Sequence, residues 1–163
     1  MTMKKIVVML LVLSSMSVKV NAQWFVGGTG GIGYFGDHVG FELAPQAGYE
    51  FNNRWAAGLG LGFGISFSED ENYGYGILDP FVRFNCWNNS KLFIDIKAEA
   101  DMRLRSNMIT TVGFVPSLRY AFNDHWQLAV DAGLVGVRIY KDDCDPYFGI
   151  TGRDVTLNLI YKF

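Results

Sequence analysis

The residues of this chain that could do chemistry are concentrated on one face of residues 92–105. Charged and apolar positions alternate there, which is typical of a β-strand whose two faces meet different surroundings. Both signs of charge are present, so we expect these side chains to form ion pairs with one another and with charges on other strands. The charged positions are Asp95, Lys97, Glu99, Asp101, Arg103 and Arg105; Leu92, Ile94, Ile96, Ala98, Ala100, Met102 and Leu104 lie between them.

Other motifs give weaker indications of chemistry. The two histidines, His38 and His125, have no serine beside them, and a nucleophilic hydroxyl needs its base within hydrogen-bond reach. Gly28 to Gly33 match the pattern G-x-G-x-x-G, but no helical pattern follows, as a dinucleotide fold requires. The acidic stretches 69–71 and 142–145 do not fit a calcium loop. We therefore expect no catalytic residue, no cofactor and no metal site.

The front of the chain reads as a secretory signal peptide. Lys4 and Lys5 precede an apolar run, residues 6–13, that is too short to cross a bilayer as a helix. Val20-Asn21-Ala22 is typical of a cleavage site. We expect a signal peptide at 1–22 and one domain at 23–163. The formal net charge is −2 and becomes more negative without the three leader lysines, which argues against a nucleic-acid partner.

The rest of the chain repeats one hairpin pattern. Alternating apolar segments return to a turn, and the aromatic residue that they share recurs every 35 to 41 residues. Asn-rich turns follow the first three segments, and Asn tolerates the backbone of tight hairpins. New strands start at Trp55, Leu92 and Trp126 after these turns, and at Trp24. We predict an all-β fold: an eight-stranded antiparallel up-and-down barrel. The returning segments are 43–51, 78–86, 114–122 and 157–163; the turns are at 52–53, 88–89 and 123–124.

Side-chain volume indicates which face points outward. The strand after Trp55 has large apolar residues on one face and only glycine on the other. An eight-stranded barrel has an interior just wide enough for side chains, so the bulky face is expected to contact lipid. Leu134 is assigned to the outward face of its strand. The charges then face a lumen and form a network. Its predicted members are Glu42, Arg83, Asp95, Lys97, Glu99, Asp101, Arg103, Arg119 and Asp131, with Glu50, Asp79 and Lys162 as further inward charges.

The tryptophans provide an independent indication of orientation. Trp24, Trp55, Trp87 and Trp126 all lie beside a short turn or the start of the domain, as an aromatic girdle at one membrane–water boundary requires. We expect this to be the periplasmic side, with both termini on it. Outer loops are predicted at 35–40, 67–75, 105–110 and 140–150, and the aromatic residues of the outer rim are Tyr34, Phe35, Phe41, Phe67, Tyr75 and Tyr140.

These features resemble the small bacterial outer-membrane β-barrels of the OmpA/OmpX type, and more closely the outer-membrane β-barrel domain proteins of Bacteroidetes-like bacteria. The resemblance rests on Pro80-Phe-Val-Arg-Phe84, on Pro116-Ser-Leu-Arg-Tyr120 and on the aromatic C-terminal strand. It implies location in the outer membrane of a Gram-negative envelope, with lipid and lipopolysaccharide as surroundings. It also implies an assembly signal read by the barrel-assembly machinery, carried by Leu157, Leu159, Tyr161 and Phe163.

Several functions remain open at this point. The first is a structural or surface-interaction barrel whose outer loops meet an unknown external partner. A small porin-like channel is the alternative, and a lipid A-modifying enzyme or a soluble lipocalin-like binder rank lower. The acidic outer stretches keep loops soluble or bridge divalent cations to lipopolysaccharide phosphates. Cys86 and Cys144 are predicted to lie at opposite ends of the barrel, too far apart for a disulfide.

Overall fold

A computed structural model describes residues 22–35, 38–67, 72–105, 108–140, 143–149 and 155–163. The expected signal peptide therefore lies outside the described residues, apart from Ala22. Every regular element in the described part is a β-strand, and no helix there is long and apolar enough to cross a membrane. The strands are β1 (Gln23–Phe35), β2 (His38–Glu50), β3 (Trp55–Phe67), β4 (Tyr73–Asn88), β5 (Leu92–Leu104), β6 (Ile109–Ala121), β7 (Trp126–Ala132), β8 (Leu134–Tyr140), β9 (Asp143–Gly149) and β10 (Val155–Lys162).

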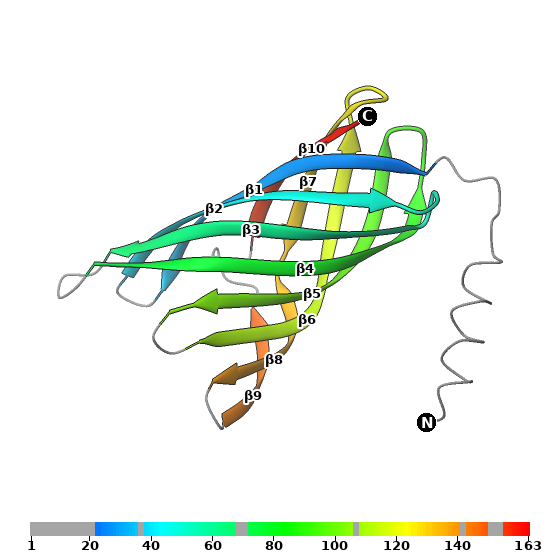
Figure 1. The fold of residues 1–163 in the computed structure, drawn as a ribbon. Coiled ribbons are helices and arrows are strands. Elements are labelled where there is room, and N and C mark those ends of the chain that lie inside the picture. The colour runs from blue at the N-terminus through cyan, green and yellow to red at the C-terminus, as the bar shows by residue number, and fades with distance from the viewer. Residues whose placement is uncertain (1–21, 36–37, 68–71, 106–107, 141–142, 150–154) are drawn as a thin grey trace, which may run out of the picture.

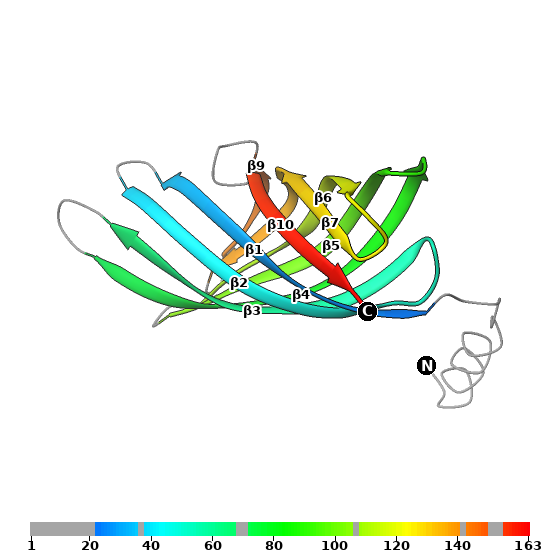
Figure 2. The same ribbon diagram turned by 90° about the horizontal axis from the view of Figure 1, so that it is seen from above.

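The ten strands make up eight strands of a closed antiparallel wall (Figures 1 and 2). β7 and β8 pair with successive parts of β6, so they are two halves of one wall strand. β10 pairs with β7 and β9 pairs with β8, so these two form the last wall strand. The predicted all-β fold and its count of eight strands are confirmed.

The wall closes where β1 meets β10. Six residue pairs join the two strands, from Phe25 opposite Lys162 to Gly30 opposite Leu157. Beyond them, the Phe163 amide donates to the Trp24 carbonyl oxygen at 3.1 Å. The hairpin turns contain the same hydrogen bond, from Phe51 to Trp55 at 2.8 Å and from Phe122 to Trp126 at 2.9 Å. The closing contact therefore repeats the geometry of a hairpin between residues far apart in the chain.

The predicted Asn turns join β2 to β3, β4 to β5 and β6 to β7. The side-chain oxygen of Asn52 accepts hydrogen bonds from the amides of Arg54 and Trp55 at 2.8 and 2.9 Å. Asn123 does the same for His125 and Trp126 at 2.9 and 2.8 Å. These turns lie at the end of the barrel that also holds the start of β1 and the C-terminus (Figure 1).

A β-bulge at Gly133 corrects one sequence prediction. Gly133 has a φ of 77°, which favours glycine, and lies between β7 and β8. Ser117 pairs with Asp131 and Phe114 pairs with Val135, so the bulged strand contains one more residue than β6 over this interval. The extra residue reverses the alternation. Leu134, which we predicted to face outward, is therefore buried in the interior.

Two further predictions on the side away from the short turns are wrong. The outer loop at 140–150 is mostly a strand, because Asp143, Cys144 and Asp145 belong to β9 and pair with β8. Tyr75 was assigned to an outer aromatic rim. It is buried instead, and its hydroxyl donates to Glu42 at 2.5 Å. The predicted acidic stretch 69–71 lies outside the described residues.

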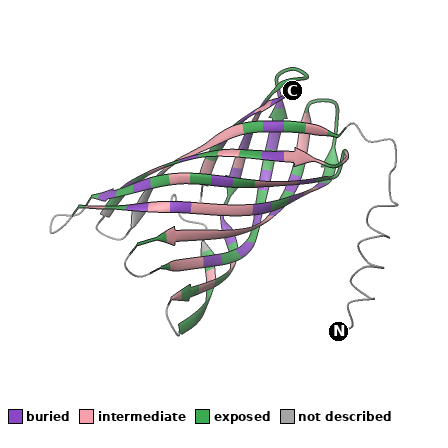
Figure 3. Cartoon of the chain, viewed as in Figure 1, coloured by how far each residue is buried: buried purple, intermediate pink, exposed green. Residues whose placement is uncertain are grey.

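Alternation of exposure along the strands separates the two faces of the wall (Figure 3). On β3, Leu59, Leu61 and Phe63 are exposed, whereas Gly60 and Gly64 are buried. The same alternation continues along β6 and β10. Large apolar residues thus cover the outside of the barrel, and polar, charged or small residues face the inside.

Glycines on the inner face accommodate aromatic rings from the neighbouring strand. Phe25 lies opposite Gly48, Phe81 opposite Gly58, and Tyr75 opposite Gly64. A Cβ atom at Gly58 would lie 2.5 Å from Cζ of Phe81 and 2.8 Å from the backbone oxygen of Ala47. Each ring therefore occupies the space that a side chain at its partner would need. The glycine-rich inner face of β3 is thus a packing surface for aromatic residues.

We expect Gly58→Ala to destabilise the barrel by about 1–3 kcal/mol, because the added methyl group overpacks the space under Phe81. Gly30→Ala is the matched control, since a Cβ atom there would meet nothing within 4 Å. Urea unfolding of the refolded chain in detergent micelles measures both changes. Equal stability of the two variants would contradict the packing argument.

Candidate functional site

The interior of the barrel holds a closed ring of charges near the end with the short turns. We call Glu50, Arg83, Asp95, Arg119 and Lys162 the terminal cluster. Arg83 lies 2.8 Å from Glu50 and 4.0 Å from Asp95, and Arg119 lies 2.8 Å from Asp95 and 3.7 Å from Glu50. Lys162 contacts the other oxygen of Glu50 at 2.6 Å. The cluster thus links β2, β4, β5, β6 and β10 across the interior.

Neutral polar groups and aromatic rings hold this cluster in place. Asn85 and Gln127 bond to Asp95 and Arg119 at 2.7 and 2.6 Å. The Arg119 guanidinium lies 4.3 Å from the centroid of the Phe93 ring. These contacts hold the charges of the cluster in fixed positions.

Two further groups of charges lie in the interior. In the central cluster, Lys97 contacts Glu99 at 2.6 Å and Asp131 at 2.7 Å, and Asn158 donates to Asp131 at 3.0 Å. The distal cluster is defined by Glu42, Asp101 and Arg103. There, Arg103 contacts Glu42 at 3.0 Å and Asp101 at 3.1 Å.

All nine predicted members of the charge network take part in these ion pairs. The structure also adds Glu50 and Lys162, which we had counted only as further inward charges. Asp79 is the exception, because no ion pair of this residue occurs among the described residues. Asn85, Gln127 and Tyr75 were missed. Asn85 and Gln127 do share the inward parity of Arg83 and Asp131, and that alternation is the signal that could have identified them.

A small apolar group also lies in the interior, where we had expected charge. Phe25, Ala56, Phe81, Ala129 and Ile160 form a buried cluster. Phe25 lies beside Arg83 of the terminal cluster, and Phe81 lies beside Lys97 of the central cluster, with cation-to-centroid distances of 5.3 and 5.7 Å. The interior is therefore filled by apolar side chains as well as by ion pairs.

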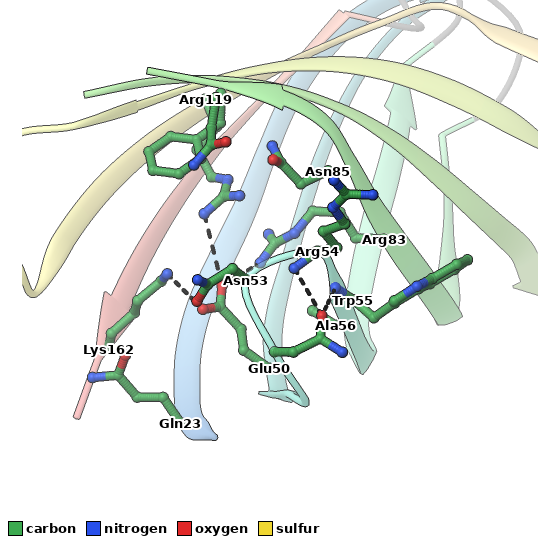
Figure 4. A pocket seen from close by; sticks show the side chains of 13 residues that line it. Gln23, Glu50, Asn53, Arg54, Trp55, Ala56, Arg83, Asn85, Arg119 and Lys162 are labelled. Carbon is green, nitrogen blue, oxygen red and sulfur yellow. Dashed lines mark hydrogen bonds and ion pairs between the residues drawn. The ribbon is translucent and has the colours of Figure 1, made fainter. Parts of the chain in front are cut away.

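A cavity of about 300 Å³ opens between the terminal cluster and the turn from β2 to β3. Glu50 lies at its centre, with Lys162, Arg83 and Arg119 directed toward it (Figure 4). Arg54 of the turn also lines the cavity. The charged lining thus consists of four cations and one carboxylate. The neutral lining residues are Gln23, Asn52, Asn53, Trp55, Ala56, Asn85, Asn88 and Phe93.

Among the other reactive residues that the structure describes, His125 has structural contacts and the two cysteines form no disulfide. His125 places its ring nitrogen 2.9 Å from the Lys162 carbonyl oxygen and stacks on Tyr161. Cys86 and Cys144 are free and exposed. In the described ranges, no three His, Cys, Asp or Glu residues are grouped so that they could hold a metal ion.

The outer surface beside the short turns carries a ring of aromatic residues. Trp24, Trp55, Trp87 and Trp126 are all exposed there. Three of them pack against the aromatic residue that recurs in the sequence. The pairs are Trp24 with Tyr49, Trp55 with Phe84 and Trp126 with Tyr161, at 5.0, 4.6 and 4.9 Å between ring centroids.

Trp87 is displaced from this pattern by an irregularity between Asn85 and Trp87, and it pairs with Ile94. The bulge inserts Cys86, whose position in the other returning segments is occupied by Phe. The sequence repeat thus encodes cross-strand aromatic pairs at the ends of hairpins.

We expect Asp131→Ala to destabilise the barrel by about 1–3 kcal/mol, because the buried donors of Lys97 and Asn158 lose a shared acceptor while Lys97 keeps its contact with Glu99. Asp124→Ala, in an exposed turn, is the control and should change stability by less than about 0.5 kcal/mol. Urea unfolding measures both. Asp131→Asn, which keeps an acceptor oxygen for these donors, should lose less stability than Asp131→Ala; an equal loss would show that the hydrogen bonds are not the cause.

Comparison with protein families and with curated proteins finds no relative of this chain. No family model matches the chain, and no curated protein matches it. The barrel wall, its interior charges and its aromatic rim are the features that bear on function.

Proposed function

We propose that this chain is an integral protein of a bacterial outer membrane, with a lumen filled by side chains and no catalytic site. Its role is structural or mediates surface interactions through the outer loops. The observation that carries the proposal is the apolar outer surface of a closed barrel. Exposed side chains on it include Leu61, Phe63, Phe114, Leu118 and Leu157.

Solvation of the apolar outer wall supports a membrane location. Water-soluble proteins rarely expose large contiguous apolar surfaces, because these drive association. A bilayer solvates such a surface but leaves unpaired backbone groups at a high cost, so a closed ring of strands is one of the two structures that span it. Here the wall is closed, the charges are inside and the apolar residues are outside. That distribution suits lipid.

The ring of aromatic residues beside the short turns supports one orientation of the barrel in the membrane. Trp and Tyr concentrate at membrane–water boundaries because one part of each ring system is apolar and another is polar. In our proposal, the four Trp residues mark the periplasmic boundary, and both ends of the domain lie on that side. The connections at 36–37, 68–72, 105–108 and 141–142 then face the cell exterior, surrounded by lipopolysaccharide.

The resemblance to small OmpA/OmpX-type barrels, including those of Bacteroidetes-like bacteria, extends the proposal to assembly. Leu157, Leu159, Tyr161 and Phe163 would carry the signal for the barrel-assembly machinery. The aromatic contacts of this strand repeat those of two internal returning strands. The ring pair of Tyr161 and Phe163 lies at 5.3 Å and nearly perpendicular, as do the internal pairs of Tyr49 with Phe51 and Tyr120 with Phe122 at 5.4 Å.

The membrane proposal is tested by placing charge on the outer wall. Leu61 is 55% exposed, and Leu61→Arg should destabilise the barrel in phospholipid vesicles by about 2–4 kcal/mol if the residue faces the bilayer midplane. Ser90→Arg, in an exposed turn, should leave stability nearly unchanged. A change near zero for Leu61→Arg would favour a soluble barrel instead.

A small channel is the second candidate, and the polar interior is the observation that favours it. The ion-pair clusters and the rings of Phe25 and Phe81 occupy that interior, so we expect no discrete conductance from the wild-type chain in planar bilayers. Lysozyme, added at the same concentration in the same detergent, serves as the blank. Reproducible unitary steps from the barrel alone would establish the channel function and contradict the filled lumen.

A further inference from the structure

The cavity at the mouth of the barrel has an imbalance of charge. Arg54, Arg83, Arg119 and Lys162 line it, and Glu50 is the one carboxylate in its lining. Asp95 lies behind the lining and offsets one more cation. The central and distal clusters show the opposite balance, with one cation and two carboxylates each. Positive charge is thus concentrated at this mouth.

Several donors in the cavity keep bonding capacity. Lys162 has three ammonium hydrogens, of which one is directed to Glu50 at 2.6 Å. Arg83 uses one terminal nitrogen for Glu50 at 2.8 Å, and its other close carboxylate, Asp95, is 4.0 Å away. The Arg54 guanidinium forms no ion pair with any residue that the structure describes. These groups come from β4, β10 and a turn, and they line one cavity.

Two of the four cations, Arg83 and Arg119, are held in position by their neighbours. Arg83 lies over the ring of Phe25, and Arg119 is fixed by Asp95, Gln127 and Phe93. A site whose donors are already positioned loses less side-chain freedom on binding. The planar guanidinium group also matches the geometry of phosphate and carboxylate oxygens.

We propose that this cavity binds a small oxyanion, a phosphate group, between Arg83, Lys162 and Arg54. The carboxylate of Glu50 already fills part of the position that such an anion would take, and it competes for the same cations. A volume of about 300 Å³ accommodates a phosphate group with water and excludes a folded partner. The proposed site lies entirely at the mouth of the barrel, so it does not depend on membrane location.

The test is calorimetric titration of inorganic phosphate into the refolded full chain in uncharged detergent at low ionic strength. We expect saturable binding at one site and none with chloride at the same ionic strength. Arg54→Gln, which removes no ion pair among the described residues, should weaken phosphate binding about fivefold or more. Lys91→Gln removes a cation from another turn at the same end, outside the cavity lining, and should leave binding unchanged.

Glu50→Gln is the most discriminating variant, because a purely structural role of Glu50 predicts weaker phosphate binding rather than tighter binding. Removing the competing carboxylate should tighten phosphate binding about tenfold. A shift in gel mobility on heating confirms in each case that the variant is folded. Absence of saturable binding to the wild type, or unchanged affinity in folded Glu50→Gln, would overturn the proposal.

The same titration identifies the source of the phosphate group. Dihexanoyl phosphatidylglycerol, below its micelle concentration, carries the group as a lipid headgroup. Competition with inorganic phosphate would support the site and assign it to a headgroup. Saturable phosphate binding without such competition would support the site and assign it to a free anion. Failure of both ligands to bind would overturn the proposal.

Discussion

The backbone hydrogen bonds between β1 and β10 are the interaction on which the rest of this structure depends. They close the sheet over Phe25–Gly30, and closure removes the unpaired edges that an open sheet would present along this part of the wall. Closure also defines an inside of limited width, so large inward rings lie over glycines and most inward charges pair with charges on other strands. The hydrogen bond from Phe163 to Trp24 completes this ring with the geometry of an internal hairpin.

Because the wall is closed, its interior has a low dielectric constant. The charges inside therefore need partners of opposite sign. Buried charges are tolerated only when they are paired and hydrogen-bonded. The terminal cluster meets this condition by sharing two carboxylates, Glu50 and Asp95, between Arg83 and Arg119. Phe25 and Phe81 lie beside the charged groups and fill space that ion pairs leave. The excess of cations at the mouth follows from the same arrangement, because Lys162 and Arg54 add charge there without adding a carboxylate.

Particular residues show why some local features could not be predicted from alternation. Leu134 has the parity of an outward residue, and only the bulge at Gly133 turns it inward. Tyr75 has the composition and position of a rim aromatic residue, but Gly64 opposite it leaves room for the ring inside. The acidic composition of 143–145 favours a loop, yet these residues pair with β8. In each case a contact with a neighbouring strand outweighs the local pattern.

The sequence by itself determined most of the strands, the Asn turns and the two faces of the wall before the bulge, because side-chain alternation and Asn turns depend on residues close together in the chain. The charges of the interior network were also predictable, since parity alone places them inside. Only the tertiary structure decided which charges meet, that Glu50 rather than Asp79 joins several cations, and that a cavity remains beside it. Those outcomes depend on the stagger between strands and on the side chains that face one another across the barrel, and both are set only when the sheet closes.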